Sequence, residues 1–344
     1  MSNSFQTSSP SESGTEVAFL ATNQDLTWGS YRILVHDLSL TLQELGASTA
    51  IVSSVDALNE VSPRVAIVNK SDATHVPAVQ QSLGQDVLIG LIQPPRDFSL
   101  ESIDFAVVVS REEESSLAAC EHILFYPLIE RLFHNSPMKE HQEALPLKVF
   151  YHGHAQHLNR FEAGLSSALD SFHSECAIEL HVVTSEEGLD WSSGRPQMVP
   201  VHVHKWELSS VAKLLLEADI GIIPNVTDYK DRIPEEEVRI DERGFYHTDY
   251  CVRFKNKSNA GRAFVFHQLG IPVIADLTPS HLHLLGNPAC GAIASDETGW
   301  LRGLRRFRSS NERNEVAKNA RDEFNRLYDP LVWGQRFLDQ LRSL

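Results

Sequence analysis

The first part of the chain alternates short apolar runs with segments of helical periodicity. Residues 17–21 are a short apolar run and predict a buried strand, and 48–53 predict the next one. Between them, apolar side chains recur at helical spacing over 31–45, and Gly46 can end that helix. Further strands are expected at 64–69, 87–92, 105–109 and 123–126, with a helix at 112–121. This order predicts a parallel sheet covered by helices on both faces.

A second series of the same kind follows residues 134–146, which lack apolar periodicity and predict a linker. We expect strands at 148–151, 178–184, 199–203 and 219–224, a loop at 152–159, and helices at 160–172 and 207–217. Residues 312–344 predict two helices separated near Pro330. The fold class is therefore α/β, with two Rossmann-like domains followed by C-terminal helices.

Positive charge is concentrated in one stretch, 253–262, which precedes a predicted helix. Ser258 or Asn259 can cap that helix, Gly270 can end it, and 271–275 predict a buried strand. The start of a helix favours an anion, and the side chains of Lys255, Lys257 and Arg262 would add charge-assisted hydrogen bonds. A diphosphate fits such a site.

This stretch resembles the nucleotide-sugar-binding segment of glycosyltransferases of the B-type fold, in particular family 4 / group 1. The resemblance is carried by Lys255, Lys257, Ser258, Asn259, Arg262 and the Leu-Gly-Ile-Pro-Val-Ile-Ala ending at 269–275. Many members of that family carry two glutamates eight positions apart here, and these fall on Lys257 and Val265. The carboxylate that usually holds the donor ribose is therefore missing.

The resemblance implies two facing Rossmann-like domains whose final helices cross back. We expect a disordered N-terminus at 1–15, an acceptor domain at 16–133, a linker at 134–147, a nucleotide-sugar domain at 148–311, and helices at 312–344 that pack on the first domain. Residues 225–251 form an acidic insertion, which we interpret either as a lid or as a solvated excursion or oligomer contact.

Further candidate residues lie where predicted strands end. Gly29, Ser30 and Arg32 follow the first strand, and His152, Gly153 and His154 follow the first strand of the second series. Arg160 is another phosphate candidate. For the base that an inverting transfer needs, Asp25, Asp97 and the His152 loop stay open. The pairs His202 with His204 and His281 with His283 carry less weight, because packing explains them equally well.

Composition limits the partners. The net charge is −16 and the pI is near 5.4, which argues against a nucleic-acid partner. No apolar run is long enough to span a membrane, although peripheral membrane contact stays open. The four cysteines are scattered and form no CxxC pair, so we expect buried thiols and a cytoplasmic protein.

The resulting functional hypothesis is transfer of a sugar from a nucleotide-sugar donor to a glycan, lipid-linked or small-molecule acceptor. Cations and a helix dipole can stabilise the leaving diphosphate, so we expect neither a metal nor a cofactor. A nucleotide-sugar epimerase would need two carboxylates as acid and base, and no convincing pair is present. A non-catalytic protein that binds a nucleotide sugar or a partner is the alternative from another class. No Gly-x-Ser-x-Gly, Walker or Gly-x-Gly-x-x-Gly motif is present.

Overall fold

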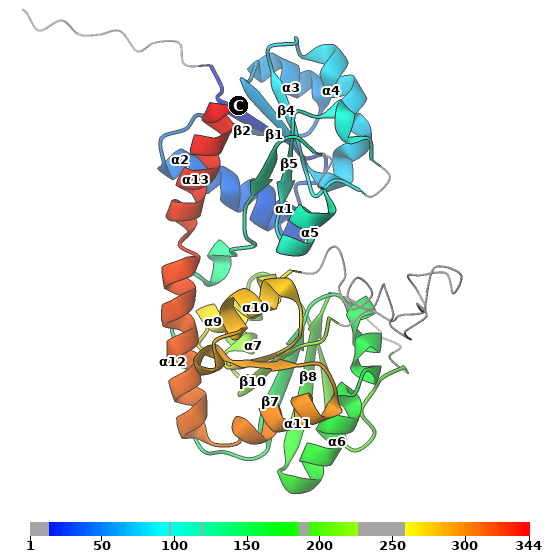
Figure 1. Ribbon diagram of the computed structural model, residues 1–344, viewed down its shortest axis with the longest axis vertical. Helices are drawn as coiled ribbons and strands as arrows, with labels where there is room; N and C mark the ends of the chain where they lie inside the picture. The colour runs from blue at the N-terminus through cyan, green and yellow to red at the C-terminus, as the bar shows by residue number, and fades with distance from the viewer. Residues whose placement is uncertain (1–13, 96–97, 118–119, 186–190, 192, 226–258) are drawn as a thin grey trace, which may run out of the picture. The chain divides into compact units, whose positions relative to one another are not determined.

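The computed structural model describes residues 14–95, 98–117, 120–185, 191, 193–225 and 259–344. The chain forms two compact units, each built around a six-stranded sheet (Figure 1). The first unit holds residues 1–107, 119–124 and 331–344, and the second holds 108–118 and 125–330. Lys255, Lys257, Ser258, Asp97 and nearly all of the acidic insertion lie outside the described residues.

The first unit has the strand order β2-β1-β3-β4-β5-β6, and β1 to β5 pair in parallel. Its strands are β1 Val17–Leu20, β2 Thr49–Val52, β3 Val65–Val68, β4 Leu88–Ile92, β5 Phe105–Val108 and β6 Ile123–Phe125. Its helical segments are α1 Gly29–Tyr31, a π-helix Arg32–Asp37, α2 Leu38–Glu44, α3 Val55–Val61, η2 Lys70–His75, α4 Val76–Ser82, η3 Leu100–Ser102 and α13 Pro330–Ser343.

One face of this sheet packs on α3 and α4, because alternate strand residues such as Ala18, Leu20 and Val68 join one apolar core with Leu58 and Val79. Helix α13 contributes its own contacts to the first unit. Arg342 forms an ion pair with Glu16, with 2.7 Å between Nε and Oε1. A Cβ on Gly334 would lie 2.5 Å from the Thr41 Cγ2 atom, so α13 and α2 approach each other closely.

The second unit is a fully parallel sheet with the order β12-β11-β10-β7-β8-β9. Its strands are β7 Leu147–His152, β8 Ile178–Thr184, β9 Val201–Lys205, β10 Ile220–Ile223, β11 Val273–Asp276 and β12 Ala292–Ala294. Its helical segments are α5 Arg111–Ser116, η4 Arg131–Phe133, η5 Ala155–Glu162, α6 Leu165–Glu175, α7 Val211–Leu215, α9 Gly261–Gln268, α10 Pro279–Leu285, η8 Pro288–Cys290, α11 Glu297–Arg306 and α12 Ser310–Leu327.

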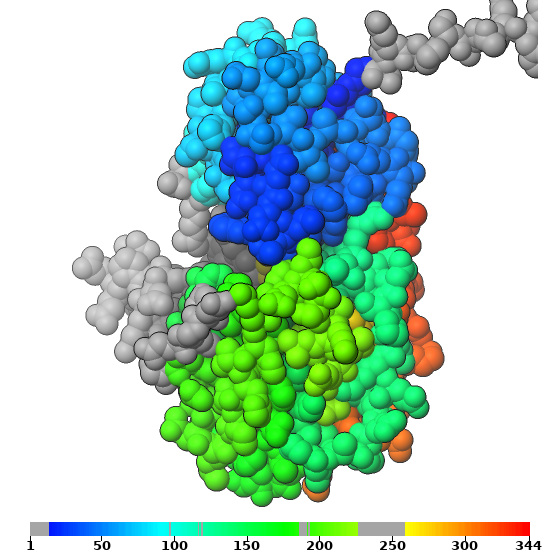
Figure 2. All heavy atoms as spheres, turned by 180° about the vertical axis from the view of Figure 1, so that it is seen from behind, coloured from blue at the N-terminus to red at the C-terminus, as the bar shows by residue number. Residues whose placement is uncertain are grey.

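Successive residues of strands such as β7 and β11 enter different cores, which places helices on both faces of the second sheet. Val149 and Ile274 belong to the core beneath α6 and α11, whereas Phe150 and Val273 belong to the core beneath α7 and α9. In Figure 1, α6 and α11 lie side by side, as their packing also shows. Figure 2 shows segments of the chain that lie between β7 and β10, green to yellow-green, at the surface of this unit.

The predicted strands are confirmed within one or two residues, whereas three predicted helices are wrong in extent. The helix expected at 112–121 ends at Ser116, and the one expected at 207–217 covers only Val211–Leu215. The helix expected at 160–172 is a 3-10 segment up to Glu162, followed by Gly164 at φ 91° and then α6. The helix expected at 31–45 is present but includes the π-helix.

Residues 134–146, predicted as a linker, form no helix or strand and belong to the second unit. His141 is buried and its Nε2 atom lies 2.9 Å from the Gly270 carbonyl oxygen. Of the described cysteines, Cys176 and Cys290 are buried and free, but Cys120 is partly exposed, so the expectation of a buried thiol is wrong there. Among the described residues, no helix combines the length and apolar composition that crossing a membrane requires.

Candidate functional site

The order of the second sheet places a topological switch point between β7 and β10. The chain starts in the middle of this sheet at β7, adds β8 and β9 on one side, and then adds β10, β11 and β12 on the other. In open α/β sheets, ligands bind outside the carboxyl ends of the strands at this point. The loops after β7 and β10 are therefore the first place to look for a site.

Arg262 lies at this switch point. It is the second residue of α9, and its Nη2 atom donates to the Pro224 carbonyl oxygen at 3.4 Å and to the Asn225 side-chain oxygen, both just after β10. Its guanidinium carbon lies 5.5 Å from the centre of the Tyr151 ring in β7. The guanidinium therefore bridges the ends of the two strands that flank the switch.

A glycine lets Arg262 approach the loop after β7. Gly153 has φ 138°, in the region that favours glycine, and a Cβ there would lie 3.1 Å from both the Arg262 Cδ atom and the Tyr151 hydroxyl. Next to it, the His152 Nε2 atom lies 3.2 Å from the Arg262 carbonyl oxygen. The His152 ring packs edge-on against Phe266 at 4.9 Å. These contacts fix α9 against β7.

Two donors at the switch point are buried without a hydrogen-bond partner among the described residues. They are the Nη1 atom of Arg262 and the side-chain nitrogen of Asn225. A buried unsatisfied donor costs about 1–3 kcal/mol, so such groups are normally paired. Both can donate to an anionic oxygen placed at the end of β10.

The start of α9 adds to this donor set. The N-cap residue Ala260 provides no side-chain cap, and the side-chain oxygen of Asn259 accepts from the Gly261 N–H at 3.1 Å. The helix begins one to two residues later than the predicted caps Ser258 and Asn259 imply. The N–H groups of the first turn have no partner within the helix, and its dipole favours negative charge.

Two buried histidines interact in this region: His281 is close to Arg262, and His267 is close to His281. The Nδ1 atom of His281 is 2.8 Å from the Asp276 carbonyl oxygen, and its Nε2 atom has no partner among the described residues. Burial, together with the nearby Arg262 charge, lowers the pKa of His281 to about 4. Burial also lowers the pKa of His267 to about 3. Both rings are therefore neutral at pH 7, and Arg262 carries the positive charge of this region.

Three further candidates of the second unit, His154, Arg160 and His283, have other contacts. The His154 ring caps η5, where its Nδ1 atom accepts from the Gln156 N–H at 3.3 Å. Arg160 follows on η5 and is partly buried, and its Nε atom has no partner among the described residues. His283 lies 2.6 Å from the Tyr328 hydroxyl. Of the predicted phosphate-binding residues, the structure thus brings Asn259 and Arg262 to the switch point.

In the first unit, Gly29 and Ser30 begin α1 after the loop that follows β1. The Nη1 atom of Arg32 donates to the Leu26 carbonyl oxygen at 2.6 Å, so this guanidinium holds its own loop. The Thr27 N–H donates to Asp25 and lowers the pKa of that carboxyl, which makes Asp25 a weak candidate for a base.

Sequence reasoning missed several side chains at the strand ends. Asn225 lies two residues after the end of β10, and the rule that ligands bind at the carboxyl ends of strands could have indicated it. In the first unit, the switch point lies between β1 and β3. There Asp72 accepts from the Thr22 hydroxyl, and Lys70 donates to Gln93 at 3.2 Å. Gln93 has φ 47°, an uncommon conformation for a residue other than glycine.

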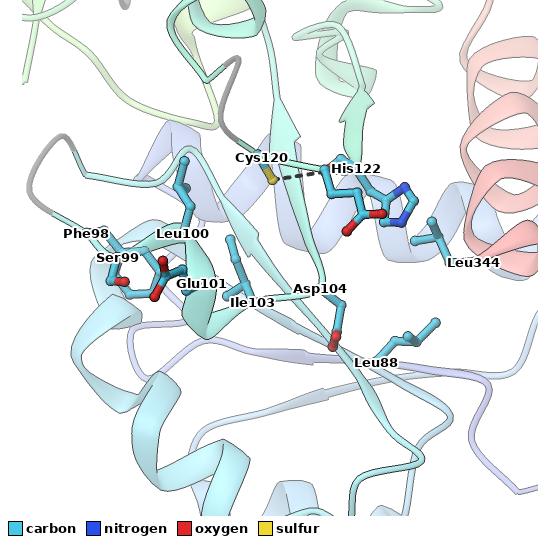
Figure 3. Close-up of a pocket in the computed structure, with 11 residues that line it drawn as sticks. Leu88, Phe98, Ser99, Leu100, Glu101, Ile103, Asp104, Cys120, His122 and Leu344 are labelled. Carbon is cyan, nitrogen blue, oxygen red and sulfur yellow. Dashed lines mark hydrogen bonds between the residues drawn. The ribbon is translucent and has the colours of Figure 1, made fainter.

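A pocket of about 710 Å³ lies in the first unit, but at the opposite edge of the sheet (Figure 3). Leu88 begins β4 and Asp104 precedes β5, so its wall is formed by the amino ends of these strands. Asp104 accepts from the Ile89 N–H at 2.7 Å and thereby supports the sheet. We therefore assign no substrate to this pocket.

The fold is similar to that of known glycosyltransferase structures. An α-glucosyltransferase in complex with UDP and a 13-mer DNA containing an HMU base aligns with TM-score 0.62 and 8% identity, over 95% of this chain and 98% of that chain. HepE of Anabaena, in complex with UDP and glucose, aligns with TM-score 0.61 and 11% identity, over 96% and 100%. A mutant of S. aureus TarM, in complex with Fondaparinux, alpha-GlcNAc-glycerol and UDP, aligns with TM-score 0.56 and 11% identity, over 84% and 58%.

These similarities confirm the predicted B-type glycosyltransferase fold with its two Rossmann-like domains and C-terminal helices. The chain spans less than two thirds of TarM but almost all of the other two proteins. No protein-family model matches the sequence, and no curated protein sequence matches it. Placement in family 4 / group 1 stays a prediction.

Proposed function

We propose that this protein transfers a sugar from a nucleoside-diphosphate donor to a hydroxyl of a glycan, a lipid-linked sugar or a small molecule. The observation that carries the proposal is the placement of Arg262 and the start of α9 at the switch point of the second sheet, where Gly153 opens the backbone to a close approach. The three known structures of this fold described above all contain UDP, which favours a uridine diphosphate donor.

The chemistry follows from where charge develops. As the bond from the sugar to the diphosphate breaks, negative charge grows on the leaving phosphate and positive charge on the anomeric carbon. The guanidinium of Arg262 and the N–H groups of α9 are fixed in place before the reaction, so they stabilise that phosphate without reorganisation. We propose that no metal takes part in this step, and that Lys255 and Lys257 add to the same cationic set.

Binding of UDP and of uridine to the same variants tests the role of Arg262. Arg262→Ala should weaken UDP binding by about 1.5–3 kcal/mol, because a charge-assisted contact is lost. Uridine carries no phosphate, so its affinity should stay close to that of the wild type. Isothermal titration calorimetry measures both, and hydrolysis of UDP-sugars reports turnover.

Two further variants make this result specific. Arg302→Ala removes an exposed arginine on α11, across the sheet from α9, and should bind UDP as the wild type does. Arg262→Lys keeps the positive charge but loses the planar guanidinium, which can donate two parallel hydrogen bonds. Its UDP affinity should lie between those of the wild type and Arg262→Ala. Equal UDP affinity in wild type and Arg262→Ala would remove Arg262 from the donor site.

One observation favours the non-catalytic alternative. Val265 stands where the family carries a carboxylate, and it is only 3% exposed in the core beneath α7 and α9. A chain of this fold without that carboxylate could bind a nucleotide sugar and not turn it over. UDP binding without hydrolysis or transfer of any UDP-sugar would support this alternative.

A further inference from the structure

A cluster of three histidines and a glutamate lies on the last two strands at one edge of the second sheet. We propose that Glu179, His181 and His202 form a binding site for one divalent transition-metal ion of the zinc class. This inference does not rest on the proposed function, because the cluster lies on β8 and β9, away from the switch between β7 and β10.

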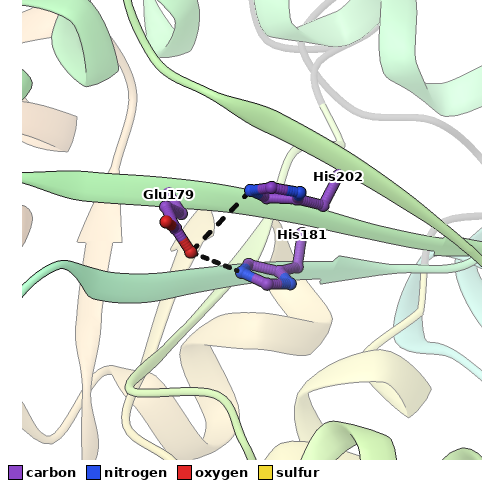
Figure 4. A group of neighbouring side chains, drawn as sticks. All are labelled: Glu179, His181 and His202. Atoms are coloured by element: carbon purple, nitrogen blue, oxygen red, sulfur yellow. Dashed lines mark hydrogen bonds and ion pairs between the residues drawn. The ribbon is translucent and has the colours of Figure 1, made fainter.

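Strand geometry brings these side chains together. Glu179 and His181 are two residues apart on β8, so they project from the same face of the sheet. His181 pairs directly with His202 on the parallel neighbour β9. Figure 4 shows the Glu179 carboxylate lying beside the two imidazole rings, with an interaction to each.

The distances suit a shared metal ion. The Glu179 Oε2 atom lies 3.4 Å from His181 Nε2 and 3.8 Å from His202 Nε2. All three ligand atoms lie within 4.8 Å of one another. Zinc bound tetrahedrally at about 2.0–2.1 Å separates its ligands by about 3.3–3.4 Å. Glu179 and His181 are already at this separation, and the half-exposed His202 completes the geometry by moving toward them.

The environment of His181 fits that of a metal ligand. Its ring stacks on Phe150 at 4.5 Å, and its Nδ1 atom lies 2.9 Å from the Nε2 atom of His204. A ligating histidine commonly donates its second ring N–H to such an acceptor, which fixes the tautomer and the ring orientation.

The ligand types select the class of metal. Two imidazoles and one carboxylate suit Zn²⁺ and neighbouring transition metals, whereas Mg²⁺ and Ca²⁺ prefer all-oxygen sites. The His202 side chain is 48% exposed, so solvent reaches the cluster and a water molecule can take the fourth position. A bound ion would join the edge strand β9 to β8 and thereby stabilise the second unit.

Metal titration of the full chain tests the proposal. We expect one Zn²⁺ per chain by calorimetry, with affinity at least ten-fold weaker in His202→Gln and in Glu179→Gln. Both side chains are partly exposed, so these variants should fold. His75→Gln removes an exposed histidine in the first unit and should bind Zn²⁺ as the wild type does. Co²⁺ should give the visible absorption of a tetrahedral site in the wild type and lose it in His202→Gln.

Thermal unfolding provides a second readout, because a ligand that binds only the folded chain raises its stability. Zn²⁺ should raise the melting temperature of the wild type and of His75→Gln, and raise that of His202→Gln less. The proposal is overturned if the wild type shows no saturable 1:1 binding. Equal Zn²⁺ affinity in wild type and His202→Gln would overturn it as well.

Discussion

At the scale of single residues, the switch point depends on a glycine. Gly153, in the loop after β7, adopts a φ of 138° and lies against the Arg262 side chain. Any other residue there would be strained and would also press on the Cδ atom of Arg262. Gly153 therefore determines both the backbone conformation of the loop after β7 and the position of the Arg262 guanidinium.

Gly153→Ala should lower the free energy of unfolding of the second unit by about 1–3 kcal/mol, because alanine does not adopt this conformation without strain. It should also weaken UDP binding, because Arg262 is displaced. Urea unfolding and calorimetry measure the two effects. Gly84→Ala is the matched control, since a Cβ at Gly84 meets nothing within 4 Å. If Gly153→Ala and Gly84→Ala behave alike, the close approach is unimportant.

At the scale of elements, α9 can pack on the sheet only because β10 carries a glycine. A Cβ at Gly221 would lie 2.5 Å from the Phe266 ring, closer than side-chain atoms approach. Phe266 is fully buried in the core beneath α7 and α9, so it has little room to move. The position of α9, and with it that of Arg262, follows from this contact.

Gly221→Ala should therefore destabilise the second unit by about 1–3 kcal/mol through overpacking. Adding Phe266→Leu should recover part of the loss, because the smaller side chain makes room for the new methyl group. Urea unfolding of the wild type, the two single variants and the double variant gives the coupling energy. Strictly additive effects would show that the ring and the glycine do not interact.

Comparison of the predicted and observed strands and helices shows which elements the local sequence pattern can predict. Short apolar runs identified every described strand except β12, because most of these strands are buried on both faces and can be recognised without knowing their partners. The helix expected at 160–172 failed because of tertiary packing. Gly164 takes φ 91° where a Cβ would lie 2.6 Å from the Glu297 backbone nitrogen, so contact with α11 interrupts the helix. Residues 277–311, for which no element was predicted, contain α10, β12 and α11.

Local sequence signals likewise predicted only part of the candidate site at the switch point. Charge and helix-start signals identified Arg262, but its partners Tyr151 and Asn225 lie 111 and 37 positions away in the chain. Strand order brings them together, and no local pattern encodes that order. His181 and His202 were likewise recognisable only after β8 and β9 had been paired.

At the scale of the whole molecule, buried histidines make stability depend on pH. Burial lowers the pKa of His267 to about 3 and that of His281 to about 4, whereas an unfolded histidine titrates near about 6.5. As pH falls below about 6.5, the unfolded chain binds protons that the folded chain does not, and the free energy of unfolding decreases. This stability is fully present above about pH 6.5.

Urea unfolding between about pH 7.5 and 5 should show this loss, at up to about 1.4 kcal/mol per pH unit for each histidine. His267→Leu removes one titrating group and should make the dependence less steep. Because both ring nitrogens of His267 have no partner among the described residues, leucine should also be tolerated at pH 7. Parallel pH profiles for wild type and His267→Leu would contradict this account.

The order of segments along the chain has a consequence for biosynthesis. Residues 331–344 belong to the first unit but follow all of the second unit in the sequence. A ribosome therefore finishes the second unit before it synthesises α13. Until then, α13 does not pack on Thr41 and Leu45, the residues that Gly334 approaches in the folded protein. Domains usually mature in the order of synthesis, but here the unit begun first is completed last.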